Sequence, residues 1–184
     1  MLARGPRPEL GGIPMTDLAR AKALAILVPA ALLAGAWGSE IWGGLNPCEM
    51  CWWQRYAHLA GLGFALLAVA LACLPDRGRS LVWLAALGIF ASGAIGAYHA
   101  GVEAKLFQGF TQCTSTTAGL SGDDLLAQIM RAPLTRCDQV QWEFLGISMA
   151  GWNAIISIVF ALLILWLSLR PPRTPGRPTA AASA

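Results

Sequence analysis

The sequence predicts an all-α integral membrane protein in which four transmembrane helices form a bundle and two loops lie on its outer face. The chain has 184 residues, of which 56% are hydrophobic and only 12% are charged, whereas soluble domains are about 25% charged. A bilayer core of about 30 Å needs about 20 mostly apolar helical residues to cross it. Four stretches lack Asp, Glu, Lys and Arg for about that length, at 23–39, 56–75, 80–102 and 144–169.

The spans and their connections follow from these stretches. A signal peptide is the alternative for the first stretch, because basic residues precede it. Three further spans follow and no convincing small-residue cleavage site ends it, so we expect a retained helix. We expect a cytoplasmic segment at 1–20, a membrane domain at 21–170 and a disordered cytoplasmic tail at 171–184. The expected spans are about 22–39, 52–74, 80–99 and 146–169, with outer loops at about 40–51 and 100–145.

The distribution of basic residues predicts the orientation of the bundle. With both termini inside, the cytoplasmic side holds nine of the 13 Lys and Arg residues and the opposite side holds four, as the positive-inside rule expects. The net charge of +3 therefore reflects topology and gives no reason to expect nucleic-acid binding. Five tryptophans lie near the expected outer boundary, where an aromatic belt forms, namely Trp37, Trp42, Trp52, Trp53 and Trp142.

Four of the five cysteines lie in the two outer loops. Cys48 and Cys51 form a CxxC pair in the first loop, and Cys113 and Cys137 lie in the second. Because the outer face of a bacterial inner membrane is oxidising, paired thiols there favour disulfides. Four cysteines allow three connectivities, and the sequence does not choose among them. The fifth, Cys73, is expected near the inner end of the second helix as a small apolar core residue.

The residues around the CxxC pair favour a reactive thiol. Asn46 suits the N-cap of the second helix and Pro47 its first position, while Glu49 can reach back to the cap. The helix would then begin at the CxxC pair, so that its partial positive charge lies beside both sulfurs. Helix N-termini and nearby cations lower the pKa of a thiol, and Arg55 follows Cys51 by about one helical turn.

Three residues on the helices are further candidates, each with a structural alternative. Arg55 is a functional-site hypothesis because it is ionisable at the membrane border, or it extends to lipid headgroups. His99 is expected at the outer end of the third helix, where it would give a ligand a hydrogen bond or a proton. A histidine satisfied by interfacial water is equally compatible with that spacing. His58 is a secondary candidate, since a histidine inside a helix is more often a packed core residue.

The second outer loop has a different character. Its segment between Cys113 and Cys137 begins polar and rich in Gly, Thr and Ser. A capping-box pattern at 121–124 then starts a short helix with an apolar face, which ends before Pro133. This helix would lie in the membrane interface or pack over the bundle. The loop therefore either presents Cys113 to a protein partner or is held by a structural disulfide.

Taken together, these residues resemble the DsbB family, the membrane proteins that regenerate disulfides for the bacterial periplasm. The resemblance covers roughly residues 22–170. A CxxC pair alone is a weak indication, but a set of motifs in the family's order on four spans is specific. The motifs are Asn46-Pro47-Cys48-Glu49-Met50-Cys51 with Arg55, Tyr98-His99-Ala100-Gly101-Val102-Glu103, Cys113, Cys137, and Gln141-Trp142-Glu143-Phe144-Leu145-Gly146 followed by Trp152-Asn153.

The resemblance implies a membrane protein-thiol oxidase of the bacterial inner membrane, with both termini cytoplasmic and the redox cysteines periplasmic. A reduced periplasmic oxidase similar to DsbA would attack Cys113 and release Cys137. Cys137 can then join Cys48 in an interloop disulfide, which releases the thiolate of Cys51. All four cysteines are therefore expected to be catalytic. The resting disulfides that we favour are Cys48–Cys51 and Cys113–Cys137.

The resemblance also implies a quinone site, occupied by ubiquinone or menaquinone. The Cys51 thiolate would contact the quinone as a charge-transfer donor beside Arg55, and His99 corresponds to the family's histidine near the quinone. The membrane would supply this electron acceptor where the second helix enters the bilayer.

Two other classes of protein are alternatives. A non-enzymatic membrane subunit, stapled by disulfides or binding zinc through four cysteines, would show no thiol exchange. Structural zinc sites usually have two close cysteine pairs, and Cys113 and Cys137 are far apart in sequence, so we expect no metal. A haem electron carrier would use His58 and His99 and would show a Soret band. A vitamin K epoxide reductase-like enzyme shares the chemistry, but its cysteine arrangement does not match.

Overall fold

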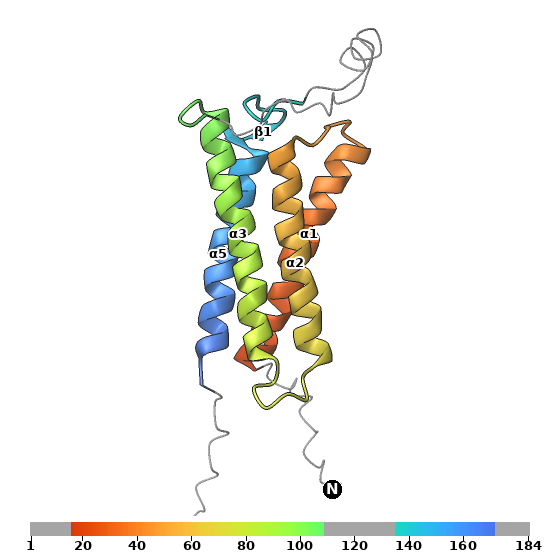
Figure 1. Cartoon of the computed structure of the whole chain (residues 1–184), viewed down its shortest axis with the longest axis vertical. Helices are drawn as coiled ribbons and strands as arrows, with labels where there is room; N and C mark the ends of the chain where they lie inside the picture. Colours follow the sequence, from red (N-terminus) through yellow and green to blue (C-terminus); the bar gives the residue numbers. More distant parts are fainter. Residues whose placement is uncertain (1–15, 109–134, 172–184) are drawn as a thin grey trace, which may run out of the picture.

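The computed structural model describes residues 16–108 and 135–171. The described chain forms an up-and-down bundle in which α1, α2, α3 and α5 lie nearly side by side (Figure 1). Oδ2 of Asp17, at the start of α1, lies 3.9 Å from NH1 of Arg170, at the end of α5. The start of α1 and the end of α5 therefore lie at the same end of the bundle. The helices are α1 (Asp17–Ile41), α2 (Glu49–Ala70), α3 (Arg79–Glu103) and α5 (Met149–Leu169).

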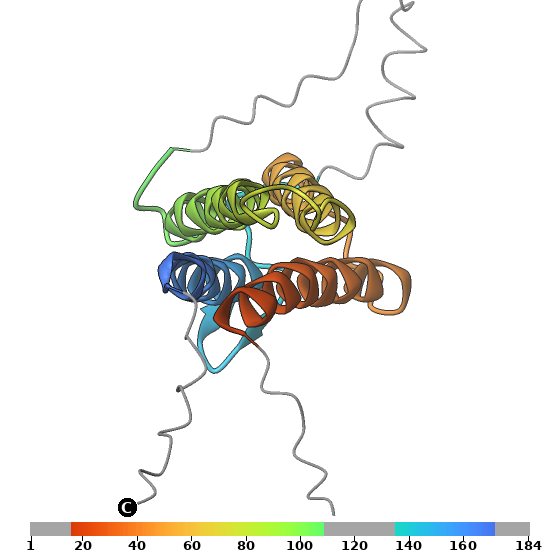
Figure 2. The same cartoon turned by 90° about the horizontal axis from the view of Figure 1, so that it is seen from below.

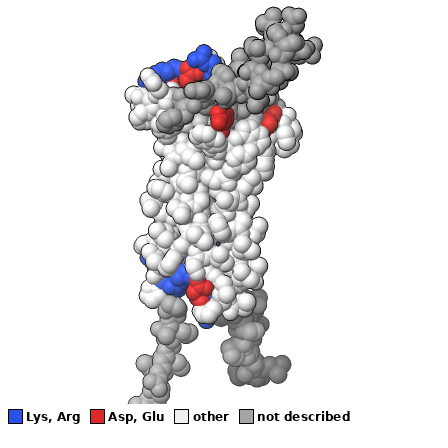
Figure 3. Space-filling view, viewed as in Figure 1, with Lys and Arg blue, Asp and Glu red and all other residues white. Residues whose placement is uncertain are grey.

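The surface of the bundle is that of a membrane protein, as the sequence predicts. Figure 3 shows Lys, Arg, Asp and Glu at the two ends and a broad uncharged band between them. Large apolar side chains such as Leu66, Leu87 and Leu162 are exposed on the outside, which suits contact with lipid. The prediction of an all-helical membrane protein is therefore confirmed.

Three of the described helices, α1, α3 and α5, are long and apolar enough to cross a membrane. α2 has 22 residues but carries Gln54, Arg55 and His58 in its first half, which lowers its hydropathy. These polar side chains are buried against the other helices, an arrangement expected of polar groups inside a membrane bundle. The fourth span therefore stays a prediction, with its membrane part beginning at about residue 52.

Small residues let α3 pack closely against α2 and α5. The end-on view in Figure 2 shows α2 and α3 in one row and α1 and α5 in the other. A Cβ atom added to Gly88 of α3 would lie 2.9 Å from the backbone of Gly61 in α2. A Cβ atom added to Gly96 would lie 3.0 Å from the backbone oxygen of Ala150 in α5. Membrane helices associate through such close backbone contacts.

Two local predictions are wrong. The N-cap of α2 is Cys48, not Asn46, and the backbone oxygen of Asn46 instead accepts a hydrogen bond from Gln141 of the second loop. Because Cys48 packs into a buried cluster, the helix begins only at Glu49. Cys73 is exposed rather than in the core, because α2 ends at Ala70 and Cys73 lies in the turn that follows.

A two-stranded hairpin leads the second outer loop into α5. Strands β1 (Glu143–Phe144) and β2 (Ile147–Ser148) pair antiparallel. Both turn residues between them have positive φ, 54° at Leu145 and 75° at Gly146, as a type I′ turn requires. Ser148 then caps α5 by accepting a hydrogen bond from the backbone N–H of Gly151. The hairpin thus fixes where the loop meets the membrane bundle.

Several sequence predictions lie outside the described residues. They concern Cys113, the short interfacial helix predicted after 121–124, and the segments before residue 16 and after residue 171.

Candidate functional site

A cavity of about 540 Å³ lies at the end of the bundle that carries the CxxC pair. One wall is apolar and comes mainly from α1, with Ala31, Leu32 and Ala36. The facing residues are polar and come from α2, α3, α5 and the second loop. They are Cys48, Cys51, Gln54, Arg55, His58, His99, Glu103, Arg136, Gln139, Gln141 and Asn153. An apolar cavity with a few convergent polar groups is the usual form of a small-molecule site.

The CxxC pair lies at the start of α2, and its two sulfurs are in contact. The Sγ atoms of Cys48 and Cys51 are 3.2 Å apart, a hydrogen-bonding distance from which an oxidant that removes two electrons and two protons could join them in a disulfide after a small rotation. Cys137 of the second loop packs into the same buried cluster as Cys48. A hydrogen bond with Cys137, a second with Cys51 and burial together raise the pKa of the Cys48 thiol. Cys48 therefore contacts both Cys51 of its own pair and Cys137 of the second loop.

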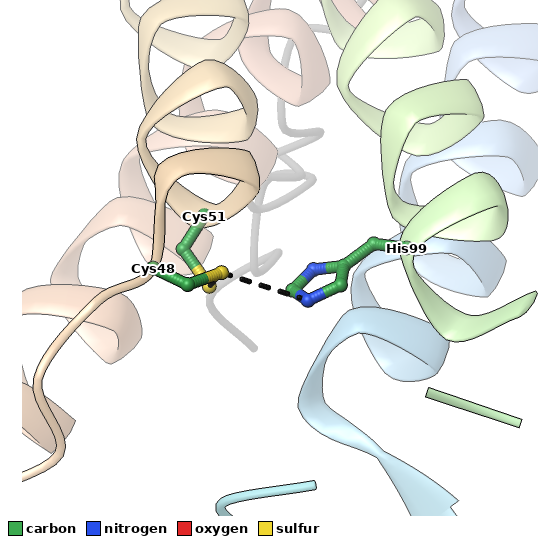
Figure 4. A group of neighbouring side chains, drawn as sticks. All are labelled: Cys48, Cys51 and His99. Carbon is green, nitrogen blue, oxygen red and sulfur yellow. Dashed lines mark hydrogen bonds between the residues drawn. The ribbon is translucent and has the colours of Figure 1, made fainter. Parts of the chain in front are cut away.

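His99 of α3 faces this pair across the cavity (Figure 4). Its Nε2 atom lies 3.6 Å from the Sγ atom of Cys48, and its Nδ1 atom lies 3.0 Å from Nε2 of Gln54. Nε2 of Gln54 also donates to the backbone oxygen of Met50, 3.1 Å away, which identifies that atom as the amide nitrogen. Nδ1 of His99 must then accept, so the neutral ring carries its proton on Nε2. His99 thus directs an N–H group at the sulfurs.

Cys51 lies in the first turn of α2, before the predicted membrane part of the helix. Its neighbours favour the thiolate form of its side chain. Donation by the Cys48 thiol, followed by the His99 ring, lowers the pKa of Cys51 to about 4 against the opposing effect of burial. The predicted low pKa is therefore supported, but its main causes are Cys48 and His99. The sequence instead predicts Arg55 as the responsible cation.

Arg55 has other partners. Its NH1 atom lies 2.6 Å from a carboxylate oxygen of Glu40, and its NH2 atom donates to the backbone oxygen of Ala36 at 3.0 Å. The guanidinium also lies 4.9 Å from the centre of the Trp52 ring. The side chain is 6% exposed, so it is held inside the bundle and does not extend to lipid headgroups.

A ladder of amides connects the two histidines. Nδ2 of Asn153 donates to Oε1 of Gln54 at 2.7 Å, and Oδ1 of Asn153 lies 2.9 Å from Nε2 of His58. Ser92 supports the ladder, because its hydroxyl donates to the backbone oxygen of Gln54 at 3.0 Å. The order along the ladder is therefore His99, Gln54, Asn153 and His58.

Two further residues of the site, Gln54 and Glu40, do not stand out in the sequence as charged residues inside a span. Gln54 is uncharged, and Glu40 follows directly after a charge-free stretch. Gln54 could have been found as a polar residue three positions after Cys51, on the same helical face. Glu103 and Asn153 belong to the motifs that resemble the family, and the motifs alone indicate no role for either residue.

Glu103 brings a carboxyl group next to His99. Its Oε1 atom lies 3.8 Å from Nε2 of His99. Its Oε2 atom is buried and has no hydrogen-bond partner among residues 16–108 and 135–171. The side chain is 9% exposed, so the cavity contains an acidic group as well as two imidazoles.

A charged clamp at the surface fixes the residue next to Cys137. Arg136 and Lys105 both bind Asp138, with N–O distances of 2.9 Å and 2.8 Å. The hydrogen bonds from Arg136, followed by that from Lys105, lower the pKa of Asp138 to about 2. Because Lys105 follows α3, the clamp holds the Cys137 segment to the end of that helix.

Cys48, Cys51 and His99 also have the donor atoms of a metal site. Their two sulfurs and one ring nitrogen lie within 4.8 Å of one another. Thiolate and imidazole ligands suit zinc, which usually takes four ligands in structural sites. Among the described residues, Cys48, Cys51 and His99 form a group that offers three ligand atoms to an ion.

The fold and the site define a helical membrane protein that brings cysteines from two loops together beside an apolar cavity. Such an arrangement serves thiol–disulfide chemistry at a membrane surface. The family described as Disulfide bond formation protein DsbB matches residues 19–167. The chain therefore belongs to the DsbB family, membrane proteins of disulfide bond formation, and the resemblance predicted from its motifs is confirmed.

Individual relatives agree with this assignment over most of the chain. Disulfide bond formation protein B of Paracidovorax citrulli is 31% identical over 174 residues, covering 88% of this chain and 93% of the relative. The Acidovorax sp. (strain JS42) protein of the same name is 32% identical, covering 91% and 97%. That of Marinobacter nauticus is 34% identical, covering 80% and 89%. No solved structure matches the chain.

Proposed function

We propose that this protein reoxidises a DsbA-like dithiol oxidase of the periplasm and passes the electrons through its two cysteine pairs to a membrane quinone. The observation that carries the proposal is the position of Cys48. Its sulfur lies 3.2 Å from that of Cys51 and hydrogen-bonds with Cys137 of the other loop. Cys48 can therefore exchange disulfide partners between the two pairs without a large movement of the backbone.

The exchange steps balance as follows. A thiolate of the reduced partner attacks Cys113, the Cys113–Cys137 bond breaks, and Cys137 leaves as a thiolate. Cys137 then attacks Cys48, the Cys48–Cys51 bond breaks, and Cys51 leaves as a thiolate. The second thiol of the partner resolves its mixed disulfide with Cys113, which releases an oxidised partner. Two electrons and two protons have then entered the cysteines of this protein.

The environment of Cys51 favours its role as the leaving group of the second step. A thiol of lower pKa leaves faster in disulfide exchange, and the pKa of Cys51 is lowered to about 4, first by Cys48 and then by His99. The raised pKa of Cys48 instead suits the sulfur that stays bonded. The two cysteines of the CxxC pair therefore differ in thiol pKa, and Cys51 is the better leaving group.

The cavity fits a quinone ring. Its volume is about 540 Å³, its α1 wall is apolar, and its polar wall contains two buried atoms without partners in the described chain, Nδ1 of His58 and Oε2 of Glu103. When bound, a quinone accepts two electrons and two protons and becomes a quinol. Cys51, His99 and Arg55 all line the cavity, so they would contact the head group. Ubiquinone and menaquinone both fit this description.

The location that we propose is the bacterial inner membrane. α2 forms the fourth span, both termini are cytoplasmic, and Cys48, Cys51, Cys113 and Cys137 lie on the periplasmic side. The excess of Lys and Arg at the opposite end of the chain's spans supports this orientation, and an oxidising compartment supports disulfide exchange.

The test is to mix the purified protein with a reduced DsbA-like oxidase and ubiquinone-1 and to follow quinone absorbance. One quinone should disappear for each partner disulfide that forms. Cys51→Ser should lower the rate at least a hundredfold, because its thiolate is the donor. Cys73→Ser is the matched control, since Cys73 is exposed at the other end of the bundle, and it should keep the full rate. Normal quinone consumption by Cys51→Ser would refute the assignment.

A further inference from the structure

His58 keeps one ring nitrogen without a protein partner. Its side chain is 3% exposed and lines the cavity. Nε2 lies 2.9 Å from Oδ1 of Asn153, whereas Nδ1 is buried without a hydrogen-bond partner in the part of the chain that the structure describes. Buried polar atoms almost always have a partner. Because the His58 side chain lines the cavity, a ligand group bound there is the partner that would complete the site.

The amide ladder fixes which kind of hydrogen bond this nitrogen can make. The nitrogen of Asn153 is identified by the backbone oxygen of Ser92, which lies 3.2 Å away and can only accept. Oδ1 of Asn153 therefore faces His58 and accepts a hydrogen bond from its Nε2–H group. A neutral imidazole with a proton on Nε2 has a bare lone pair on Nδ1. Nδ1 is thus an acceptor and needs a ligand that donates.

The neutral form of His58 follows from its neighbours. Its hydrogen-bonding contacts are Asn153 and the hydroxyl of Ser157, 3.4 Å from Nε2, and neither is charged. A buried imidazolium without a carboxylate partner would be costly. The carboxyl group of Glu103 contacts the other histidine, His99.

We propose that Nδ1 of His58 accepts a hydrogen bond from a hydroxyl of bound quinol, so that the cavity binds the reduced ligand more tightly than the oxidised one. This inference rests on the proposed function and gives a ligand-binding role to His58, which is only a secondary candidate in the sequence. A quinone offers only carbonyl oxygens, which are acceptors and would meet the Nδ1 lone pair without a proton between them. A quinol offers the proton that this contact needs.

The consequence is a higher midpoint potential for the bound ligand. The overall step converts a dithiol and a quinone into a disulfide and a quinol, with two electrons and two protons moving together. If quinol binds tenfold more tightly than quinone, the two-electron potential of the bound couple rises by about 30 mV. His58 would thereby increase the driving force for electron transfer from the cysteine pairs to the quinone. This helps a protein whose partner is itself an oxidant.

The experiment measures two dissociation constants in the absence of turnover. The full chain carries Cys48→Ser and Cys51→Ser, which stops electron transfer, and is titrated anaerobically in nanodiscs with ubiquinone-1 and, separately, with its quinol. In this background His58→Phe keeps a flat ring but removes Nδ1. Ser157→Ala is the matched control, because it removes a polar group beside Nε2 and leaves Nδ1 unchanged.

We expect the ratio of quinone to quinol dissociation constants to fall about fivefold to tenfold in His58→Phe and to stay within twofold in Ser157→Ala. If both ligands bind but His58→Phe leaves the ratio unchanged, the role of His58 is refuted while the proposed function stands. If neither ligand binds the background protein or the oxidised protein with its natural cysteines, the quinone site itself is refuted and this inference with it.

A second measurement does not depend on the folding of the variant. Nitrogen-15 NMR of the histidine rings distinguishes a protonated from an unprotonated ring nitrogen. Nδ1 of His58 should be unprotonated in the free protein, and its signal should move when quinol is added but much less with quinone. A protonated Nδ1 in the free protein, or equal shifts with both ligands, would overturn the inference.

Discussion

Nε2 of His99 lies 3.6 Å from the sulfur of Cys48. His99 is on α3 and Cys48 caps α2, and 51 positions separate them in the sequence. The contact places an imidazole N–H group beside the CxxC pair, where it stabilises a thiolate. The same ring is held from behind by Gln54, 3.0 Å from Nδ1. This geometry makes the protonation of the cysteine pair dependent on α3.

The first prediction concerns the thiol pKa of Cys51. His99→Phe should raise it by about one unit or more toward its ordinary value, because one thiolate-stabilising hydrogen bond is lost. The lowered pKa of about 4 means that Cys51 is reactive as a thiolate above that pH and loses reactivity as the pH falls through it. In the variant, this loss should occur at a higher pH. The measurement is the rate of alkylation of Cys51 against pH, resolved by peptide mass spectrometry.

The matched control for this experiment is His58→Phe. His58 is buried on α2, but its hydrogen bonds go to Asn153 and Ser157 and not to the cysteine pair. The alkylation profile of Cys51 should therefore not change. Equal shifts in both variants would show that loss of either ring merely loosens the bundle.

The second prediction concerns the buried ion pair between Arg55 and Glu40. Removing one partner of such a pair leaves a charge uncompensated, which typically costs about 3–5 kcal/mol when the pair is fully buried. Arg55 is 6% exposed and Glu40 33%, so we expect a smaller loss, about 1–3 kcal/mol, for Glu40→Gln. Arg55→Gln should raise the KM for ubiquinone-1 at least tenfold, because the cation lines the cavity.

Two measurements separate these effects. Thermal unfolding in detergent reports stability, and steady-state kinetics report the KM. Formation of the Cys48–Cys137 disulfide after addition of a reduced partner should remain measurable in Arg55→Gln, since that step needs no quinone. Loss of interloop disulfide formation together with quinone use would contradict a specific role of Arg55 at the cavity.

The coarse fold and the cysteine site could be predicted because they depend on local patterns. Charge-free stretches predict membrane helices, and a CxxC pair before such a stretch is placed at the start of the helix, where the structure has it. The partner of Arg55 could not be predicted, because Glu40 reaches it from α1 only through the packing of two helices. Gln54 and Asn153 are neutral, so a search for charges passes over them, although their hydrogen bonds orient both histidines.

The helix start shows how tertiary packing overrides a local signal. Asn46, Pro47 and Glu49 form a favourable capping sequence, yet α2 begins at Glu49 and its N-cap is Cys48. The backbone of Asn46 is held by Gln141, and the thiol of Cys48 is buried with Cys137. Contacts to the second loop, which no local pattern contains, therefore decide where the helix begins.

The third prediction concerns the clamp formed by Asp138. Asp138→Asn removes the charge that binds Arg136 and Lys105, so the segment of Cys137 should be held less firmly. We expect Cys48–Cys137 disulfide formation to slow about twofold to fivefold, measured by rapid acid quench and thiol labelling. The groups are at the surface, where salt weakens ion pairs, so the difference from the natural protein should shrink in 1 M salt.

The sign of the pH effect supports salt as the better test. Asp138 has a lowered pKa of about 2, so its stabilising effect is complete above the ordinary carboxyl pKa and disappears only as the pH falls toward 2. The clamp is therefore intact at any neutral pH. Glu143→Gln is the control, because Glu143 is also an exposed carboxylate in this loop but is not part of the clamp. A slower rate in this variant would indicate a general effect of loop charge.

The last prediction tests the close approach of α2 and α3. A Cβ atom at Gly88 would lie 2.9 Å from the backbone of Gly61, and a backbone cannot rotate away as a side chain can. Gly88→Leu must therefore push the two helices apart, at a cost of about 1–3 kcal/mol or more for overpacking. His99 lies on α3 and the cysteine pair on α2, so separation should also lengthen the contact between Nε2 and the Cys48 sulfur. Gly63→Leu is the matched control, since no atom lies within 4 Å of a Cβ added there. We expect a lower melting temperature and a raised Cys51 pKa in Gly88→Leu alone; equal melting temperatures for the two variants would show that this helix contact does not position the site.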